Sequence, residues 1–270
     1  MKVILSRKGF DSSYGAQPSP ILPDGTLLSL PIPYNRGILF SEPKYNNESY
    51  LDIIKQLRPR TNIDKNTYCH LDPDIRIEAK ARNENWKGLY GQSGAAQTHL
   101  DNMNVDIDDV FLFFGWFKKT EMTEKGLRYI KNAPDLHVIF GYFQIGEKYK
   151  ERTQKITNIE HHPHANFDEK NDCIYEASNE LSFINKYKGY GCLSYNDDLV
   201  LSKSGMPRSK WQLPEIFKEL QITYHNKNSF KNDFFQSAAK GQEFIIKDGN
   251  LIIDWVKNII VKGTKHNNLN

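Results

Sequence analysis

Two long apolar runs dominate the middle of the chain, at residues 110–117 and 137–146. Both are rich in aromatic and β-branched residues, and neither alternates regularly with polar ones. Such runs predict central strands of a sheet that is buried on both faces. Each run contains one glycine, Gly115 or Gly141, which predicts a bulge or the close approach of another backbone. A shorter apolar run at 1–5 predicts a third buried strand.

Other patterns predict turns and helices. The Pro-Asp-Gly-Thr segment at 23–26 has strong turn chemistry and predicts a tight reversal between two apolar stretches. Residues 49–57 combine a Ser-x-x-Asp start with apolar residues at helical spacing, so we expect a helix there. Small residues at 94–96 favour a helix beginning near 95. Pro214 is placed as in a first helical turn, so we expect a helix from there to about 220.

Near the C-terminus, apolar residues at 243–246 and 251–256 flank the turn-like segment Lys-Asp-Gly-Asn, which predicts a hairpin. Residues 262–270 form a polar tail that we expect to fray. We see no repeat and no clear linker. The sequence therefore predicts a single α+β domain over residues 1–261, with a central, largely buried sheet flanked by helices.

Composition and charge say more about the cellular compartment of the protein than about its function. The chain has 270 residues, 39% of them apolar, and a formal net charge of +3 that neither requires nor excludes nucleic acid. Its three cysteines are widely spaced and form no Cys-x-x-Cys pair, which disfavours disulfides and a cysteine-based zinc site. We find no secretory leader and no apolar run long enough to span a membrane, so we expect a cytoplasmic protein.

The first predicted strand leads directly into a polar loop at residues 6–15. Within it, Arg7 and Lys8 are candidate contacts for DNA phosphates, Asp11 is a candidate catalytic carboxylate, and Ser12 and Ser13 are candidate substrate contacts. Polar groups on a loop held by a rigid strand are typical of active sites. The alternative is that Asp11 and the two serines only cap backbone N–H groups.

A second candidate cluster is the histidine-rich turn at 161–164. His162 and His164 lie two residues apart, as imidazoles that share a ligand on an extended segment do. A metal would need further ligands, and these residues could supply them only if the fold brings them close: Asp11, His70, Asp72 and Glu160. We expect binding or proton transfer in the same pocket as Asp11, with no metal and no other cofactor.

Residues 91–99 supply hydrogen-bonding groups, and the central strands supply aromatic ones. Gln92, Gln97 and His99 could read a base edge, although tight packing also explains the small residues between them. Trp116 and Tyr142 are candidates to stack on a flipped base, although most aromatics in such runs belong to the core.

The chain carries several distinctive segments in a fixed order, at residues 6–13, 18–25, 91–97, 111–117, 137–147 and 162–164. Together these segments resemble the third of the nucleotide-modification-associated domain families, over about residues 1–215. The resemblance implies that the protein handles modified DNA, in phage or bacterial DNA modification or in defence against it, without fixing the reaction.

The residues themselves favour cleavage of an N-glycosidic bond. Asp11 would orient water or stabilise the oxocarbenium charge, as carboxylates do in glycoside hydrolysis. The glutamines and His99 would hold the extruded base, and His162 or His164 would contact the phosphate or assist the leaving base. The sequence therefore predicts a DNA-base glycosylase in anti-phage defence, with a base-modifying transferase and a non-catalytic reader of modified bases as alternatives.

Overall fold

A nine-stranded mixed sheet forms the centre of the protein. The computed structural model describes residues 1–153, 155–156, 159, 162–239 and 241–264. The main strand order is β16-β1-β9-β11-β12-β8, with β2 and β10 also paired to β9 and β13 paired to β11. The strands are β1 (Val3–Arg7), β2 (Ser19–Ile21), β8 (Leu89–Gln92), β9 (Val110–Thr123), β10 (Gly126–Tyr129), β11 (Leu136–Tyr149), β12 (Cys173–Ala177), β13 (Tyr190–Cys192) and β16 (Glu243–Ile246).

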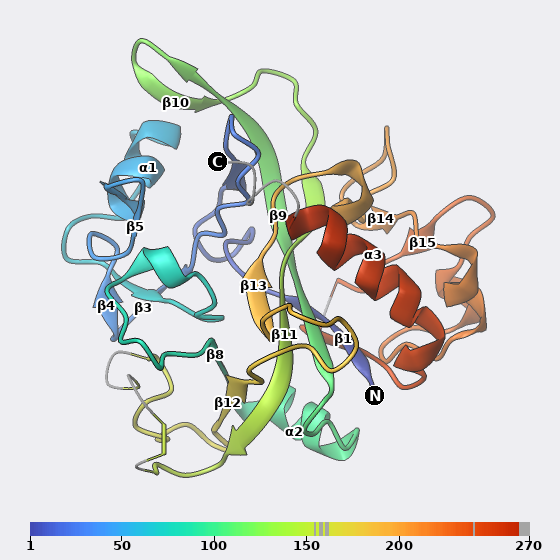
Figure 1. Cartoon of the computed structure of the whole chain (residues 1–270). Coiled ribbons are helices and arrows are strands. Elements are labelled where there is room, and N and C mark those ends of the chain that lie inside the picture. The colour runs from blue at the N-terminus through green and yellow to red at the C-terminus, as the bar shows by residue number, and fades with distance from the viewer. Residues whose placement is uncertain (154, 157–158, 160–161, 240, 265–270) are drawn as a thin grey trace.

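The two long apolar runs are β9 and β11, as predicted, and they pair antiparallel through the middle of the molecule (Figure 1). Both predictions about their glycines are confirmed. The register of the pair shifts between Ile139 and Gly141, as at a bulge. A Cβ on Gly115 would lie 2.6 Å from the carbonyl oxygen of Lys8, so the loop after β1 approaches β9 closely there. Strand β1 is parallel to β9 and antiparallel to β16.

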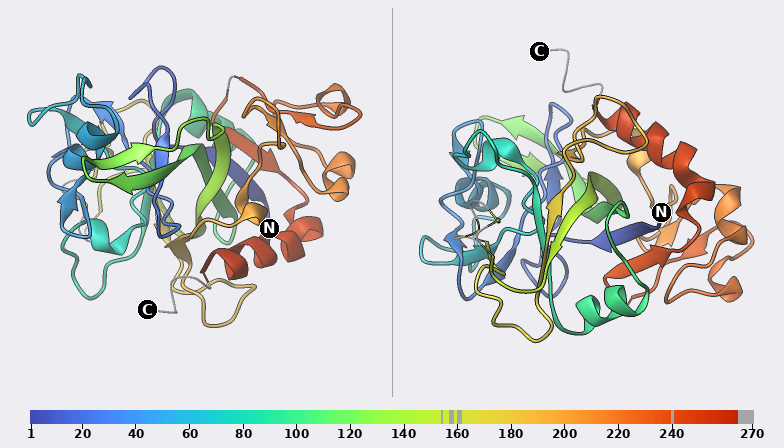
Figure 2. Two further views of the ribbon diagram at one scale, coloured as in Figure 1. Left: turned by 90° about the horizontal axis from the view of Figure 1, so that it is seen from above. Right: turned by 60° about the horizontal axis from the view of Figure 1, so that its bottom comes forward.

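Smaller elements cover the two sides of this sheet. In Figures 1 and 2 the segment with α1 and β3 to β7 lies on one side, and the segment with β14, β15 and α3 lies on the other. The first has its own apolar cluster, which includes Phe40 and Ile54. The remaining strands are β3 (Ile32–Tyr34), β4 (Ile38–Leu39), β5 (Lys44–Tyr45), β6 (Glu48–Ser49), β7 (Tyr68–His70), β14 (Lys210–Trp211) and β15 (Phe235–Gln236).

Two helix predictions and the turn are confirmed. Helix α1 (Tyr50–Leu57) begins after Ser49, whose side chain accepts a hydrogen bond from the Asp52 amide, and α2 (Gly94–Asn102) follows β8. The turn at 23–26 lies between Ile21 and Leu27, which form an antiparallel bridge. The segment 215–219 is a short 3₁₀ helix, η3 (Glu215–Glu219), instead of the predicted longer helix.

The C-terminal hairpin prediction is wrong. Strand β16 forms, but the second half becomes a 3₁₀ turn, η5 (Gly249–Ile252), followed by helix α3 (Ile253–Thr264). The buried residues of α3, Val256, Ile259 and Ile260, have helical spacing and pack on the main core. Among the described residues that follow it, strand β16 therefore has no hairpin partner, and it pairs with β1. Residues 265–270 of the predicted tail lie outside the described part.

The architecture is therefore a single α+β domain, as predicted. Within the described residues, no helix has both the length and the apolar character needed to cross a membrane. The remaining 3₁₀ helices are η1 (Ile77–Ala79), η2 (Asp197–Leu199) and η4 (Lys227–Ser229).

Candidate functional site

A polar cavity of about 370 Å³ lies where β1 and β8 end. Six separate stretches of the chain contribute to its wall, because the sheet brings together segments that are remote in sequence. Four come from the first 93 residues: the end of β1 and its loop with Arg7, Lys8, Asp11 and Tyr14, Ile32 in β3, the end of β7 and its loop with His70 and Asp72, and residues 91–93 with Gln92. The other two are later segments with His164 and Gln242.

Asp11 lines this cavity and also shapes its own loop. One carboxylate oxygen, Oδ1, accepts hydrogen bonds from the amides of Ser13 and Tyr14, both at 2.7 Å. The capping interpretation is thus correct for Oδ1. Among the described residues Oδ2 has no hydrogen bond, so this oxygen is available to a ligand. The Asp11 side chain can therefore cap the loop with one oxygen and contact a ligand with the other.

Arg7 and Lys8 also line the cavity, but their charged groups are already engaged. The Arg7 guanidinium donates to the carbonyl oxygens of Ala238 (2.7 Å) and Ala239 (3.1 Å). Its burial lowers the pKa of this group, against the opposing effect of nearby Asp11. Lys8 Nζ lies 3.0 Å from Glu243 Oε1 in a pair of nearly buried side chains. Both cations therefore belong to the wall of the cavity, and their contact with phosphates stays a prediction.

Glu243 is the centre of a buried polar network beside the cavity. Besides Lys8, its Oε1 accepts hydrogen bonds from Tyr90 OH and Gln92 Nε2, each at 2.8 Å. Gln92 Nε2 also donates to Tyr90 OH at 3.0 Å, so both of its N–H groups are used. Gln92 therefore orders the cavity wall, and reading of a base edge by its amide would require these bonds to break. Neither Tyr90 nor Glu243 was singled out from the sequence.

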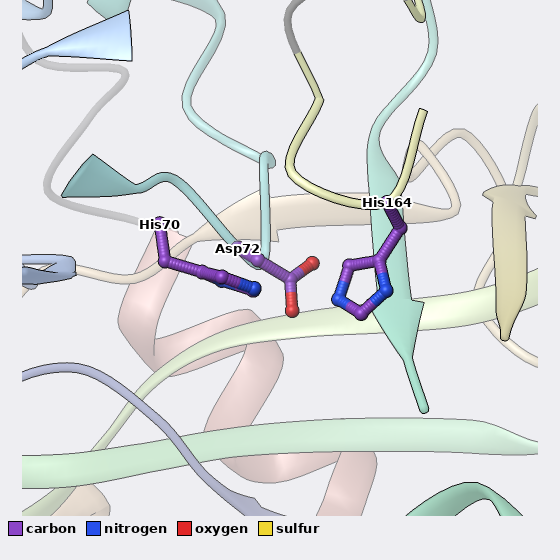
Figure 3. A group of neighbouring side chains, drawn as sticks. All are labelled: His70, Asp72 and His164. Atoms are coloured by element: carbon purple, nitrogen blue, oxygen red, sulfur yellow. The ribbon is translucent and has the colours of Figure 1, made fainter. Parts of the chain in front are cut away.

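Two imidazoles and one carboxylate meet on another wall of the cavity. His70 ends β7, Asp72 follows it, and His164 arrives from the turn before β12; Figure 3 shows the Asp72 carboxylate between the two rings. Their candidate ligand atoms all lie within 4.8 Å of one another. The fold thus produces the convergence of His70 and Asp72 on His164 that a metal site would require.

Hydrogen bonds hold two of these side chains, His164 and Asp72. His164 Nδ1 lies 2.6 Å from Asp172 Oδ1, and Asp72 Oδ1 accepts the Gly91 amide at 2.7 Å. A Cβ on Gly91 would lie only 2.2 Å from His164 Cδ2, so glycine is needed for this approach.

The charges of this group follow from its burial and from the neighbouring imidazoles. Loss of hydration lowers the pKa of His70 to about 3, which leaves the ring neutral near pH 7. Burial alone would raise the pKa of Asp72, but His162 and the other two imidazoles outweigh it and lower the pKa to about 2. His162 Nε2 lies 3.5 Å from Asp72 Oδ1, beyond good hydrogen-bond length, and is buried without a hydrogen bond in the described part.

The other predicted site residues lie away from the cavity. Gln97 is buried and bonded to Tyr175 and Asp101, whereas His99 faces a separate surface hollow beside α2. Tyr142 is in the core. Trp116 and Ser12 both contact Arg208, and neither lines the cavity. The structure does not bring these groups, or the exposed Ser13, to the cavity wall. His161 and Glu160 lie outside the described residues.

The convergence of remote segments explains what sequence reasoning missed. The Lys8–Glu243 pair spans 235 positions, and Asp172, eight residues after its partner His164, sits in an unremarkable Asn-Asp-Cys stretch. No local spacing marks these partners.

Comparison with known proteins places the chain in a family. We found no match among the curated proteins or the solved structures. The model of the nucleotide modification associated domain 3 family, however, matches residues 2–247, which cover the sheet and every described cavity residue. The chain therefore belongs to the nucleotide modification associated domain 3 family.

Proposed function

We propose that this protein is an enzyme that acts on modified bases in DNA and excises them hydrolytically. Its family supports a role with modified nucleotides. The observation that carries the proposal is the Asp11 oxygen without a hydrogen bond among the described residues, in a polar cavity of about 370 Å³ that His70 and His164 also line. That volume is in the range of about 300–1,000 Å³ typical of small-ligand sites, so a base turned out of the helix could enter.

The proposed reaction is addition of water to the sugar carbon that carries the base. The C1′–N bond breaks, its electron pair leaves with the base, and a C1′–O bond forms to water. The water loses one proton and the departing base gains one. Asp11 faces the positive charge that develops on the sugar, and preorganised charge of this kind is a major contribution to catalysis. His164, oriented by Asp172, contacts the phosphate or assists the departing base.

The test is incubation with DNA from phages that carry modified bases, followed by mass spectrometry of released bases and detection of abasic sites. Asp11→Asn should lower the rate by about 10² or more, because it removes the charge and keeps the size. Asp24→Asn is the matched control: Asp24 also caps a turn, through the Thr26 amide at 2.8 Å, but lies outside the cavity wall.

The outcomes separate the alternatives. Near-normal turnover by a folded Asp11→Asn protein would exclude the proposed role of this carboxylate. A mass increase of the base that depends on a co-substrate would indicate a transferase. Binding to modified DNA with neither product, unaffected by Asp11→Asn, would indicate a reader. Defence against phages is tested separately, by comparing infection of cells with wild-type and Asp11→Asn protein.

A further inference from the structure

We propose that His70, Asp72 and His164 bind one divalent transition-metal ion in the cavity. The sequence predicts no metal here, whereas the fold brings these three side chains together. Binding of an ion by them does not depend on the reaction proposed above.

The geometry is close to that of a ligated site. Two ligand atoms of a tetrahedral ion lie about 3.3 Å apart when each bond is about 2.0–2.1 Å long. The atoms offered here are all within 4.8 Å of one another. Closing the group around an ion therefore needs a movement of under about 1 Å per side chain, which small changes of side-chain torsion provide.

The hydrogen bonds leave the right atoms free. Asp172 engages Nδ1 of His164, which leaves Nε2 for an ion. The Gly91 amide engages Oδ1 of Asp72, which leaves Oδ2. Neither ring nitrogen of His70 has a hydrogen bond among the described residues. A carboxylate behind a histidine ligand is a common feature of metal sites, where it fixes the ring and raises its basicity.

A second observation points to the same place. His162 is 6% exposed, and its Nε2 is buried and unpaired within the described part, 3.5 Å from Asp72 Oδ1. A buried polar atom without a partner is costly, and small rearrangement on ion binding would let it donate to the carboxylate. His162 would then position Asp72 and would not itself bind the ion.

The donor set indicates the class of ion. Two imidazoles and one carboxylate suit zinc, iron, manganese and related ions, whereas calcium and magnesium prefer oxygen ligands alone. Since the three side chains line an open cavity, the remaining coordination positions face the place where a ligand would lie. An ion there would act as a Lewis acid on a phosphate or a departing base, in place of direct contact by His164, whose Nε2 would hold the ion.

The test measures metal binding without any nucleic acid. Chelator-treated full-length protein is titrated with Zn²⁺, Co²⁺ and Mn²⁺ by calorimetry, and bound metal is counted by elemental mass spectrometry. We expect one ion per chain. His70→Asn and Asp72→Asn should weaken its affinity by about 100-fold or more, and Asp172→Asn by about 10–100-fold. His99→Asn is the control, because His99 lies in a different hollow.

A folded wild-type protein that takes up no ion would overturn the proposal. So would ion binding that is unchanged in both the His70→Asn and the Asp72→Asn proteins, or a loss of binding in the His99→Asn protein that is as large as in these two. If a variant fails to fold, the wild-type protein still decides: Co²⁺ should protect His70 and His164 from diethyl pyrocarbonate, read by mass spectrometry of peptides. Unchanged modification at both would count against the site. A negative result here leaves the base-release assay unaffected, and base release without metal binding would leave the proposed function standing alone.

Discussion

Replacing Lys8 by methionine should destabilise the fold strongly. Lys8 and Glu243 form an ion pair at 3.0 Å, with side chains only 9% and 1% exposed. Methionine fills similar space but leaves the Glu243 charge buried, and Glu243 Oε2 already lacks a hydrogen bond within the described part. Breaking a buried pair from one side costs about 3–5 kcal/mol. Because Tyr90 and Gln92 still donate to Oε1, we expect a loss near 3 kcal/mol in the free energy of unfolding.

The assay is urea unfolding followed by tryptophan fluorescence, with linear extrapolation to water. The double variant Lys8→Met/Glu243→Gln should recover most of the loss, since it removes both charges and keeps an oxygen for Tyr90 and Gln92. Lys218→Met is the control: its ion pair with Glu215 is exposed, so its effect should be within about 0.5 kcal/mol. A Lys8→Met protein within about 1 kcal/mol of wild type, or a double variant no better than the single one, would refute the reasoning. The outcome matters for DNA-binding tests, because weaker binding by a Lys8 variant could reflect a damaged fold.

Three further outcomes are expected. Gly91→Ala should lower the free energy of unfolding by about 1–3 kcal/mol through the clash with His164. Gly191→Ala, whose new Cβ would lie no closer than 3.1 Å to the Tyr142 ring, should cost less by the same urea assay. Burial lowers the pKa of His137 to about 3, so as the pH falls below about 6.5 this histidine is protonated in the unfolded chain before it is in the folded one. Acidification therefore destabilises the fold, and His137→Asn should reduce this loss between pH 6 and pH 4 by about 1.4 kcal/mol per pH unit. The measurement is urea unfolding at each pH. Gln92→Ala should lower stability by about 1–3 kcal/mol, because it removes a donor from buried Glu243, and an unchanged value would show that the network contributes little.

The sheet was predictable because the sequences of its central strands are distinctive. A run such as 110–117 is too apolar to lie anywhere but the core, and its glycine marks a real close approach. The structure of the C-terminal segment was not predictable, because a short apolar run fits a strand or a helix equally well. The helix is favoured by the residues that follow, Ile259 and Ile260, whose spacing matches a helical face packed on the core.

The cavity was predictable only in part. The loop after β1 and the His162–His164 turn were recognised because polar groups are dense in each. Their partners were not, because they are single residues placed by pairing: β12 pairs with β8, which brings the turn before β12 beside Gly91 and Asp72. The aromatic candidates failed to reach the cavity for the opposite reason, since rings in central strands are used first for the core, as Tyr142 is.

The position of β1 has a consequence for synthesis of the chain. Lys8 and its partner Glu243 are 235 positions apart, and β1 pairs with β16 on one side. At a translation rate of about 5–20 residues per second, some 12–50 s pass between the emergence of the two partners. During this interval the edge of β1 that will pair with β16 stays open, and Lys8 lacks its carboxylate partner. An open edge invites pairing with other chains, so the unfinished chain is more prone to aggregation than the complete one.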